Sequence, residues 1–264
     1  MDEPEIIDTD SDSDGKGFQG IPIRYLLPNL LTLLALCSGV TAIRWAVEGR
    51  TELAVSAIIL AAVLDGLDGR LARYMKGTSR FGAELDSLAD FVNFGVAPAI
   101  MLYFWSLNSL KTFGWVISLM LAIACALRLA RFNVALDDPN QPNWVKAYFT
   151  GMPAPAGALL VMAPFYLGLL WDQTDGHAFS KSIAAFTILI AILMVSRVPT
   201  FSGKNIARVP REYALPILAI MAMGIVLLVS FPWQILAIAA AIYLALIPVS
   251  IISYRRRKRA NLGD

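Results

Sequence analysis

The chain of 264 residues is 57% hydrophobic and 16% charged, and its formal net charge is +2 at pH 7. A single histidine and two cysteines argue against a zinc site and against a disulfide framework. Its apolar residues come in runs of about twenty, the length that spans the hydrocarbon of a bilayer, which predicts an integral membrane protein of helical type.

The two ends of the chain differ in charge from the region between them. Seven of the first fourteen residues are Asp or Glu, which predicts a disordered acidic tail over residues 1–20. Residues 21–254 are predicted to form one transmembrane domain, and 255–264 a basic tail held by anionic lipid headgroups rather than by nucleic acid. About eight spans are expected, near 25–47, 52–72, 84–105, 112–132, 153–171, 182–198, 212–230 and 233–253.

The distribution of Lys and Arg orients this predicted all-α bundle. Basic residues collect on the cytoplasmic side of a membrane. With the N-terminus inside, 18 of the 22 basic residues fall on inner segments. An even number of spans with both termini in the cytoplasm is therefore predicted. The basic residues left outside are Arg44, Arg50, Lys111 and Lys181.

Four aspartates lie in one frame on the second and third predicted spans. Asp65 and Asp68 are three residues apart, and Asp86 and Asp90 are four apart. These spacings put each pair on one helix face, and the polar turn over residues 74–81 brings the two pairs opposite each other. Because a carboxylate near lipid costs a few kcal/mol, about 3 on insertion scales, such residues usually mark a site.

Oxygen ligands of this kind suit Mg²⁺ or Mn²⁺, especially where substrate phosphates complete the coordination. We expect two such divalent cations, which can stabilise both the attacking and the leaving oxygen of a displacement at phosphorus. Two alternatives stay open. The aspartates could pair with Arg70, Arg73 and Arg80 at the surface, for about 1 kcal/mol per pair at most. They could also line the path of a divalent-cation transporter, although this would not explain Gly69, Ala72 and Arg73 in the same frame.

The order of these residues resembles the signature of the CDP-alcohol phosphotransferase family. The resemblance implies a helical bundle that binds a CDP-linked substrate over two metal ions. It then transfers the phosphoryl-alcohol portion of that substrate to a second alcohol and releases CMP. The matching positions are Asp65, Asp68, Gly69, Ala72, Arg73, Gly82, Asp86 and Asp90.

The resemblance also implies roles for individual residues. Three aspartates would be metal ligands, and Asp90 would be both a ligand and the general base that takes the proton of the incoming hydroxyl. Gly69 and Ala72 leave room for the nucleotide near the backbone, and Gly82 should let the third span pack near the second. The implied contacts to the CDP-linked substrate are Asn29, Thr32, Gly69, Arg73 and Ser79; the implied metal ligands are Asp65, Asp68, Asp86 and Asp90.

Three downstream segments, 126–133, 149–157 and 196–204, resemble the membrane-embedded bacterial phosphatidylserine synthases, a branch of that family. This likeness implies CDP-diacylglycerol as donor and L-serine as acceptor, with phosphatidylserine and CMP as products. It further implies a multi-pass protein of the bacterial cytoplasmic membrane, with its active site facing the cytoplasm and a homodimeric assembly among membrane lipids.

A physical argument agrees with serine as the acceptor. Guanidinium groups suit carboxylates through paired hydrogen bonds, so Arg128 and Arg131 are candidate serine ligands. The alternative for both is ordinary anchoring on the cytoplasmic side or binding of lipid phosphate. Inositol, glycerol 3-phosphate and choline remain alternative acceptors, because the family signature does not separate them.

Overall fold

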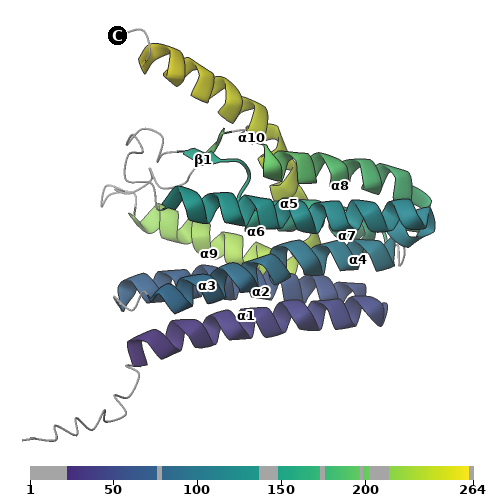
Figure 1. Cartoon of the computed structure of the whole chain (residues 1–264), viewed down its shortest axis with the longest axis horizontal. Helices are drawn as coiled ribbons and strands as arrows, with labels where there is room; N and C mark the ends of the chain where they lie inside the picture. Colours follow the sequence, from purple (N-terminus) through teal and green to yellow (C-terminus); the bar gives the residue numbers. More distant parts are fainter. Residues whose placement is uncertain are drawn as a thin grey trace, which may run out of the picture.

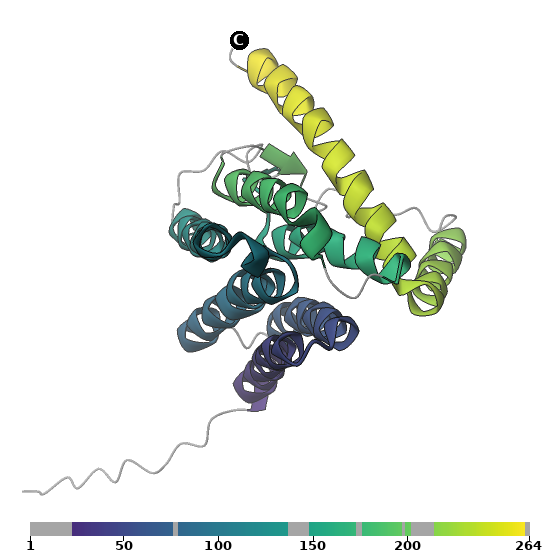
Figure 2. The same cartoon turned by 90° about the vertical axis from the view of Figure 1, so that its right-hand side faces the viewer.

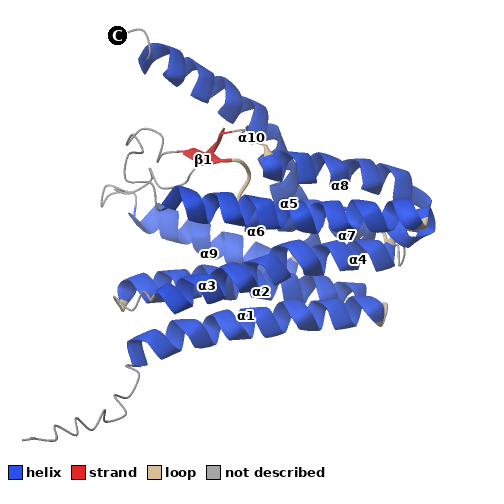
Figure 3. Cartoon of the chain, viewed as in Figure 1, coloured by secondary structure: helices blue, strands red, loops and turns tan. Residues whose placement is uncertain are grey.

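The computed structural model describes residues 23–75, 79–136, 148–172, 176–196, 199–201 and 214–261. Almost all of them are helical (Figure 3). The predicted acidic tail lies outside this part of the chain. The helices are α1 (Ile23–Val47), α2 (Thr51–Tyr74), α3 (Arg80–Asp90), α4 (Ala97–Trp105), α5 (Thr112–Leu136), α6 (Ala154–Val161), α7 (Ala163–Leu170), α8 (Ser180–Val195), α9 (Ala214–Ser230) and α10 (Pro232–Asn261).

The composition of these helices is that of a membrane protein. Within the described residues, five helical stretches are long and apolar enough to cross a bilayer. Two shorter apolar stretches cover α6 with α7, and α9. The prediction of a helical bundle with helices able to span a membrane is thus confirmed, while the eight spans with both termini inside stay a prediction. The five longer stretches are Leu26–Val47, Arg80–Trp105, Thr112–Ala135, His177–Val195 and Pro232–Ser250.

Most helices lie side by side along a common direction (Figure 1). Seen along that direction, α1 and α2 form a pair at one side, and α3 with α4 separates this pair from α5 (Figure 2). α8 packs on α5, while α7 contacts α10. α9 lies at the opposite edge beside α10, and its side chains are exposed along its length, as expected of a helix that faces lipid.

Small residues let α1 and α2 approach closely. α2 buries Ala54, Ala57 and Ala61, and the hydroxyl of Ser38 on α1 donates to the carbonyl of Ala57 at 2.8 Å. In lipid, small side chains and hydrogen bonds of this kind drive the association of helices, since burial from water contributes little. The pair is therefore a firm support for the side chains at its end.

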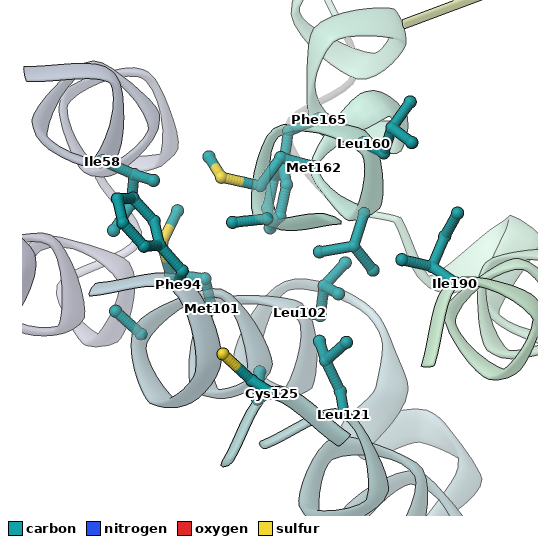
Figure 4. Close-up of a cluster of buried hydrophobic side chains, with 14 of the residues drawn as sticks. Ile58, Phe94, Met101, Leu102, Leu121, Cys125, Leu160, Met162, Phe165 and Ile190 are labelled. Atoms are coloured by element: carbon teal, nitrogen blue, oxygen red, sulfur yellow. The ribbon is translucent and has the colours of Figure 1, made fainter. Parts of the chain in front are cut away.

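The core lies where α4, α5, α6, α7 and α8 meet (Figure 4). Phe94 points toward Ile58 of α2, and Leu121 and Cys125 enter the cluster from α5. The ring of Trp105 lies 4.5 Å from that of Phe165, measured between centroids. This apolar cluster fixes α2 and α5 relative to each other, and both helices carry charged residues discussed below.

Two of the predicted spans are interrupted helices. α3 is followed by a π-helical segment, Phe91–Val96, before α4 begins. α6 and α7 are separated at Met162, and Pro164 in the first turn of α7 lacks the N–H that a continuous helix would need. The sequence did not predict the short antiparallel pair of strands formed by β1 (Tyr148–Thr150) and β2 (Pro199–Phe201). At the other end, α10 continues through Asn261, so the segment predicted as a basic tail from residue 255 is mostly helix.

Candidate metal centre

The local sequence explains why α3 starts where it does. Ser79 has extended backbone angles and its hydroxyl accepts a hydrogen bond from the N–H of Gly82 at 2.9 Å, so Ser79 is the N-cap of α3. α3 therefore runs from Arg80 with Asp86 and Asp90 one turn apart on one side. The predicted contact of Ser79 with substrate phosphate belongs to a residue whose hydroxyl already stabilises the helix start. The turn residues 76–78 lie outside the described part of the chain.

Three of the four aspartates converge. Carboxylate oxygens of Asp65, Asp68 and Asp86, one from each residue, all lie within 4.8 Å of one another. The carboxyl group of Asp90 lies beside that of Asp65 on the facing helix. The structure thus brings all four predicted metal ligands to one place between α2 and α3.

Within the described part of the chain, no salt bridge balances this cluster. Among the described residues, ion pairs join only Glu48 to Arg44 and Arg50, all far from the aspartates in sequence and at the other end of α1 and α2. Arg70, Arg73 and Arg80 form none with the aspartates, so the surface-pairing alternative is wrong. Four crowded carboxylates in a helical bundle, without a paired base, have the donor chemistry of a divalent-cation site.

Thr32 of α1 completes the setting of Asp68. The Thr32 hydroxyl donates to Oδ2 of Asp68 at 2.7 Å, and it also lies 3.2 Å from the carbonyl oxygen of Pro28. Both side chains are buried, with Asp68 only 3% exposed. A hydrogen bond to a buried carboxylate orients that carboxylate, so Thr32 positions one of the predicted metal ligands. The sequence had suggested for Thr32 a contact with the CDP-linked substrate.

Asn29 lies one turn before Thr32 and packs against α3. A Cβ added at Gly82 would stand 2.8 Å from Oδ1 of Asn29, closer than real Cβ contacts come. Gly82 therefore allows α3 to approach α1. The expectation that Gly82 lets the third span pack near the second is wrong. Asn29 and Thr32 together extend the site from α2 and α3 onto α1.

Gly69 and Arg73 lie on the open side of α2. Nothing comes within 4 Å of a Cβ placed at Gly69, and the Arg73 side chain is exposed. Space beside Gly69 and a free-standing guanidinium nearby suit the approach of a phosphorylated ligand to the α2 backbone.

The two arginines of α5 have different surroundings. Arg128 is 7% exposed, its Nε donates to the carbonyl of Met152 at 3.0 Å, and its guanidinium lies 4.9 Å from the centre of the Phe132 ring. It also interacts electrostatically with Asp90. Arg131 instead donates to the carbonyl of Val195, at the end of α8, at 2.6 Å. Only Arg128 belongs to the aspartate site, and Arg131 stabilises a helix end.

One further polar contact and one buried polar residue near the site were not predicted from the sequence. Nδ2 of Asn133 donates to Oγ of Ser87 at 2.9 Å and ties α5 to α3 beside Asp86. Asn93 in the π-helical segment is buried close to Asp90 in sequence. A polar residue in an apolar span was the available signal for Asn93, whereas the Ser87 contact depends on how two helices face each other.

Comparison with known proteins agrees with this geometry. The sequence model of CDP-alcohol phosphatidyltransferase matches residues 25–195, and a second, CDP-alcohol phosphatidyltransferase 2, matches residues 212–248. The chain belongs to the CDP-alcohol phosphatidyltransferase family. The matched region contains every residue of the aspartate cluster, together with Asn29, Thr32 and Arg128.

Several bacterial members of this family are similar to the chain over most of its length. It is 39% identical over 241 residues to a CDP-diacylglycerol–serine O-phosphatidyltransferase of Mycobacterium tuberculosis, covering 91% of this chain and 82% of the relative. The enzyme of the same name from Mycobacterium leprae is 40% identical over 233 residues, with 87% and 76% covered. That of Helicobacter pylori is 33% identical over 220 residues, with 83% and 88% covered.

Proposed function

We propose that this protein transfers the phosphatidyl group of CDP-diacylglycerol to the hydroxyl of L-serine, giving phosphatidylserine and CMP. The observation that carries the proposal is the convergence of Asp65, Asp68 and Asp86 between α2 and α3, beside Asp90 and with no balancing salt bridge from any described residue. The similarity to serine-specific members of the family supports serine as the acceptor.

The aspartates would hold two divalent cations, Mg²⁺ or Mn²⁺. When bound, such ions supply positive charge beside the diphosphate of the donor, which is where negative charge develops during phosphoryl transfer. Thr32 keeps Asp68 oriented for this task. Asn29, Gly69 and Arg73 surround the same cluster and are the residues we assign to the cytidine nucleotide and its phosphates.

Asp90 is the proposed general base. It takes the proton of the serine hydroxyl while the serine oxygen forms a bond to the phosphorus that carries diacylglycerol. The bond from that phosphorus to the bridging oxygen breaks, and CMP leaves with the electron pair. A single in-line displacement of this kind inverts the configuration at phosphorus.

Arg128 is the proposed ligand of the serine carboxylate. Its guanidinium is held by the carbonyl of Met152 and by the face of Phe132, so it is fixed in position before serine arrives. Its neighbour Asp90 would then meet the hydroxyl of the same serine molecule. A buried guanidinium beside Asp90 also disfavours the transporter alternative, because it places a positive charge next to the path of a cation.

The proposed setting is the bacterial cytoplasmic membrane. Eight spans with both termini in the cytoplasm would put the aspartate cluster at the inner face, where CDP-diacylglycerol is reached from the inner leaflet and serine from the cytoplasm. The family resemblance also leads us to propose a homodimer.

One assay tests the reaction. Purified protein in lipid nanodiscs is given CDP-diacylglycerol with Mn²⁺ or Mg²⁺ and, separately, serine, inositol, glycerol 3-phosphate or choline, and CMP release is measured. We expect CMP and phosphatidylserine with serine alone. Turnover with another alcohol would refute the assigned acceptor. Flux of Mn²⁺ into liposomes without a CDP-lipid and without turnover would favour the transporter.

A further inference from the structure

Asn93 carries a polar side-chain amide in the buried interior of the helical bundle. It lies in the π-helical segment that follows α3, three residues after Asp90, and it is 1% exposed. Among the residues that the structure describes, neither its Oδ1 nor its Nδ2 has a hydrogen-bond partner. Its chain neighbours Phe94 and Gly95 are buried as well.

The position of the amide is set by α1. A Cβ at Gly39 would overlap the Asn93 carboxamide, and the amide oxygen is the closest of all atoms to it. The oxygen therefore faces the α1 backbone and the nitrogen is directed away from it. Only a glycine at residue 39 leaves room for this arrangement.

Packing does not account for an asparagine here. A buried amide without a hydrogen bond is destabilising, and an apolar side chain of similar volume would suit the surrounding core better. Unsatisfied polar groups of this kind are uncommon in folded proteins, and π-helical segments are frequent at functional sites. The residue is thus better explained by a ligand or a partner that it meets during the reaction.

Asp90, three residues earlier in the chain, is the candidate partner. Its Oδ1 is also buried and has no hydrogen-bond partner in the described part of the chain, while its carboxyl group faces Asp65. Asn93 follows Asp90 by three residues, at the junction of α3 with the π-helical segment. One unused donor and one unused acceptor therefore lie less than one helical turn apart along the chain, and hydrogen bonds of catalytic groups often tighten only in the loaded site.

We propose that Asn93 is a positioning residue for Asp90: its Nδ2 donates to Oδ1 of Asp90 in the metal-loaded site. This leaves the second carboxylate oxygen of Asp90 directed at Asp65 and the cations. The inference rests on the function proposed above for Asp90. It adds a residue outside the acidic cluster, supported from behind by Gly39 of α1.

A pair of variants isolates the hydrogen bond from the packing. Asn93→Ser and Asn93→Ala leave nearly the same space, but only Ser keeps a donor. We expect kcat for CMP release with serine to be about tenfold to hundredfold lower in the Ala variant than in the Ser variant, with both KM values within about twofold. The Kd of Mn²⁺, measured by electron paramagnetic resonance without serine, should be higher in the Ala variant only.

Stability separates this role from a structural one. Asn93→Leu removes the unpaired amide, so its Tm should equal or exceed that of the unchanged protein while its kcat falls. The matched control is Asn108→Ala, near the opposite ends of these helices, where Oδ1 also lacks a partner; its kcat should not change. Equal kcat and equal Mn²⁺ affinity in the Ser and Ala variants would overturn the proposal.

The two proposals fail differently. If the unchanged protein does not use serine, the proposed function is wrong, but Mn²⁺ affinity still distinguishes the Ser and Ala variants. If serine is used and Asn93→Ala matches Asn93→Ser in both measurements, only the role of Asn93 is refuted. A fall in Tm common to all three Asn93 variants, with proportional loss of activity, would also refute it and make Asn93 a packing residue.

Discussion

Thr32→Val removes one hydroxyl and keeps the shape of the side chain. In the structure this hydroxyl donates to Oδ2 of Asp68 at 2.7 Å, in a buried setting where water cannot replace it. A hydrogen bond to a charged group contributes about 1.5–3 kcal/mol. If that free energy holds Asp68 in the geometry that binds the cation, its loss corresponds to about tenfold to 150-fold weaker metal binding.

The measurement is the Mn²⁺ concentration that gives half-maximal CMP release at saturating CDP-diacylglycerol and serine. Thr41→Val is the matched control, because Thr41 lies on the same helix and its hydroxyl donates only to the carbonyl of Cys37, at 2.6 Å. We expect the half-maximal concentration to rise by at least tenfold for Thr32→Val and to stay unchanged for Thr41→Val. An equal shift in both variants would mean that Thr32 acts on the helix and not on Asp68, and the reasoning would be refuted.

Three further changes follow from the same geometry. Asp90→Asn keeps the shape and removes the base, so turnover should be lost while CDP-diacylglycerol still binds, as measured by calorimetry. Arg128→Lys should raise the KM for serine about tenfold and leave the KM for CDP-diacylglycerol unchanged, because Lys lacks the planar guanidinium that pairs with a carboxylate. Arg131→Lys should change neither KM. Equal effects of Arg128→Lys on the two KM values would argue that Arg128 only anchors the helix. Gly82→Ala should displace Asn29 and raise the KM for CDP-diacylglycerol by about tenfold or more. An unchanged KM would exclude the assigned contact between Asn29 and the nucleotide.

The sequence predicted those features that depend on periodicity along one helix. Runs of apolar residues located the helical segments to within a few residues, and the spacing of the aspartates put Asp65 with Asp68, and Asp86 with Asp90, on shared faces. The small residue at Gly69 was expected to leave space beside α2, and the structure has open space there.

The turn over residues 74–81 was predicted to bring the two aspartate pairs opposite each other, and they do converge. Other features that depend on how helices face one another were not predicted. Thr32 contacts Asp68 and Gly82 faces Asn29 because α1 packs on both α2 and α3, which no spacing within one segment reveals. Likewise, Arg131 meets the carbonyl end of α8, 64 residues away in sequence.

The break in regular helix after Asp90 was missed for a different reason. Its residues are apolar enough to continue an α-helix, and nothing in their order signals the π geometry that the structure shows beside Gly39 of α1. Asn93, within that segment, was the single polar side chain in an apolar run and could have been singled out on that ground alone.

Anomalous diffraction from crystals grown with Mn²⁺ would show whether the four aspartates hold divalent cations. We expect two anomalous peaks between α2 and α3, about 3.5–4 Å apart and coordinated by carboxylates of Asp65, Asp68, Asp86 and Asp90. Catalytically active protein whose crystals show no anomalous density among these four side chains would contradict it.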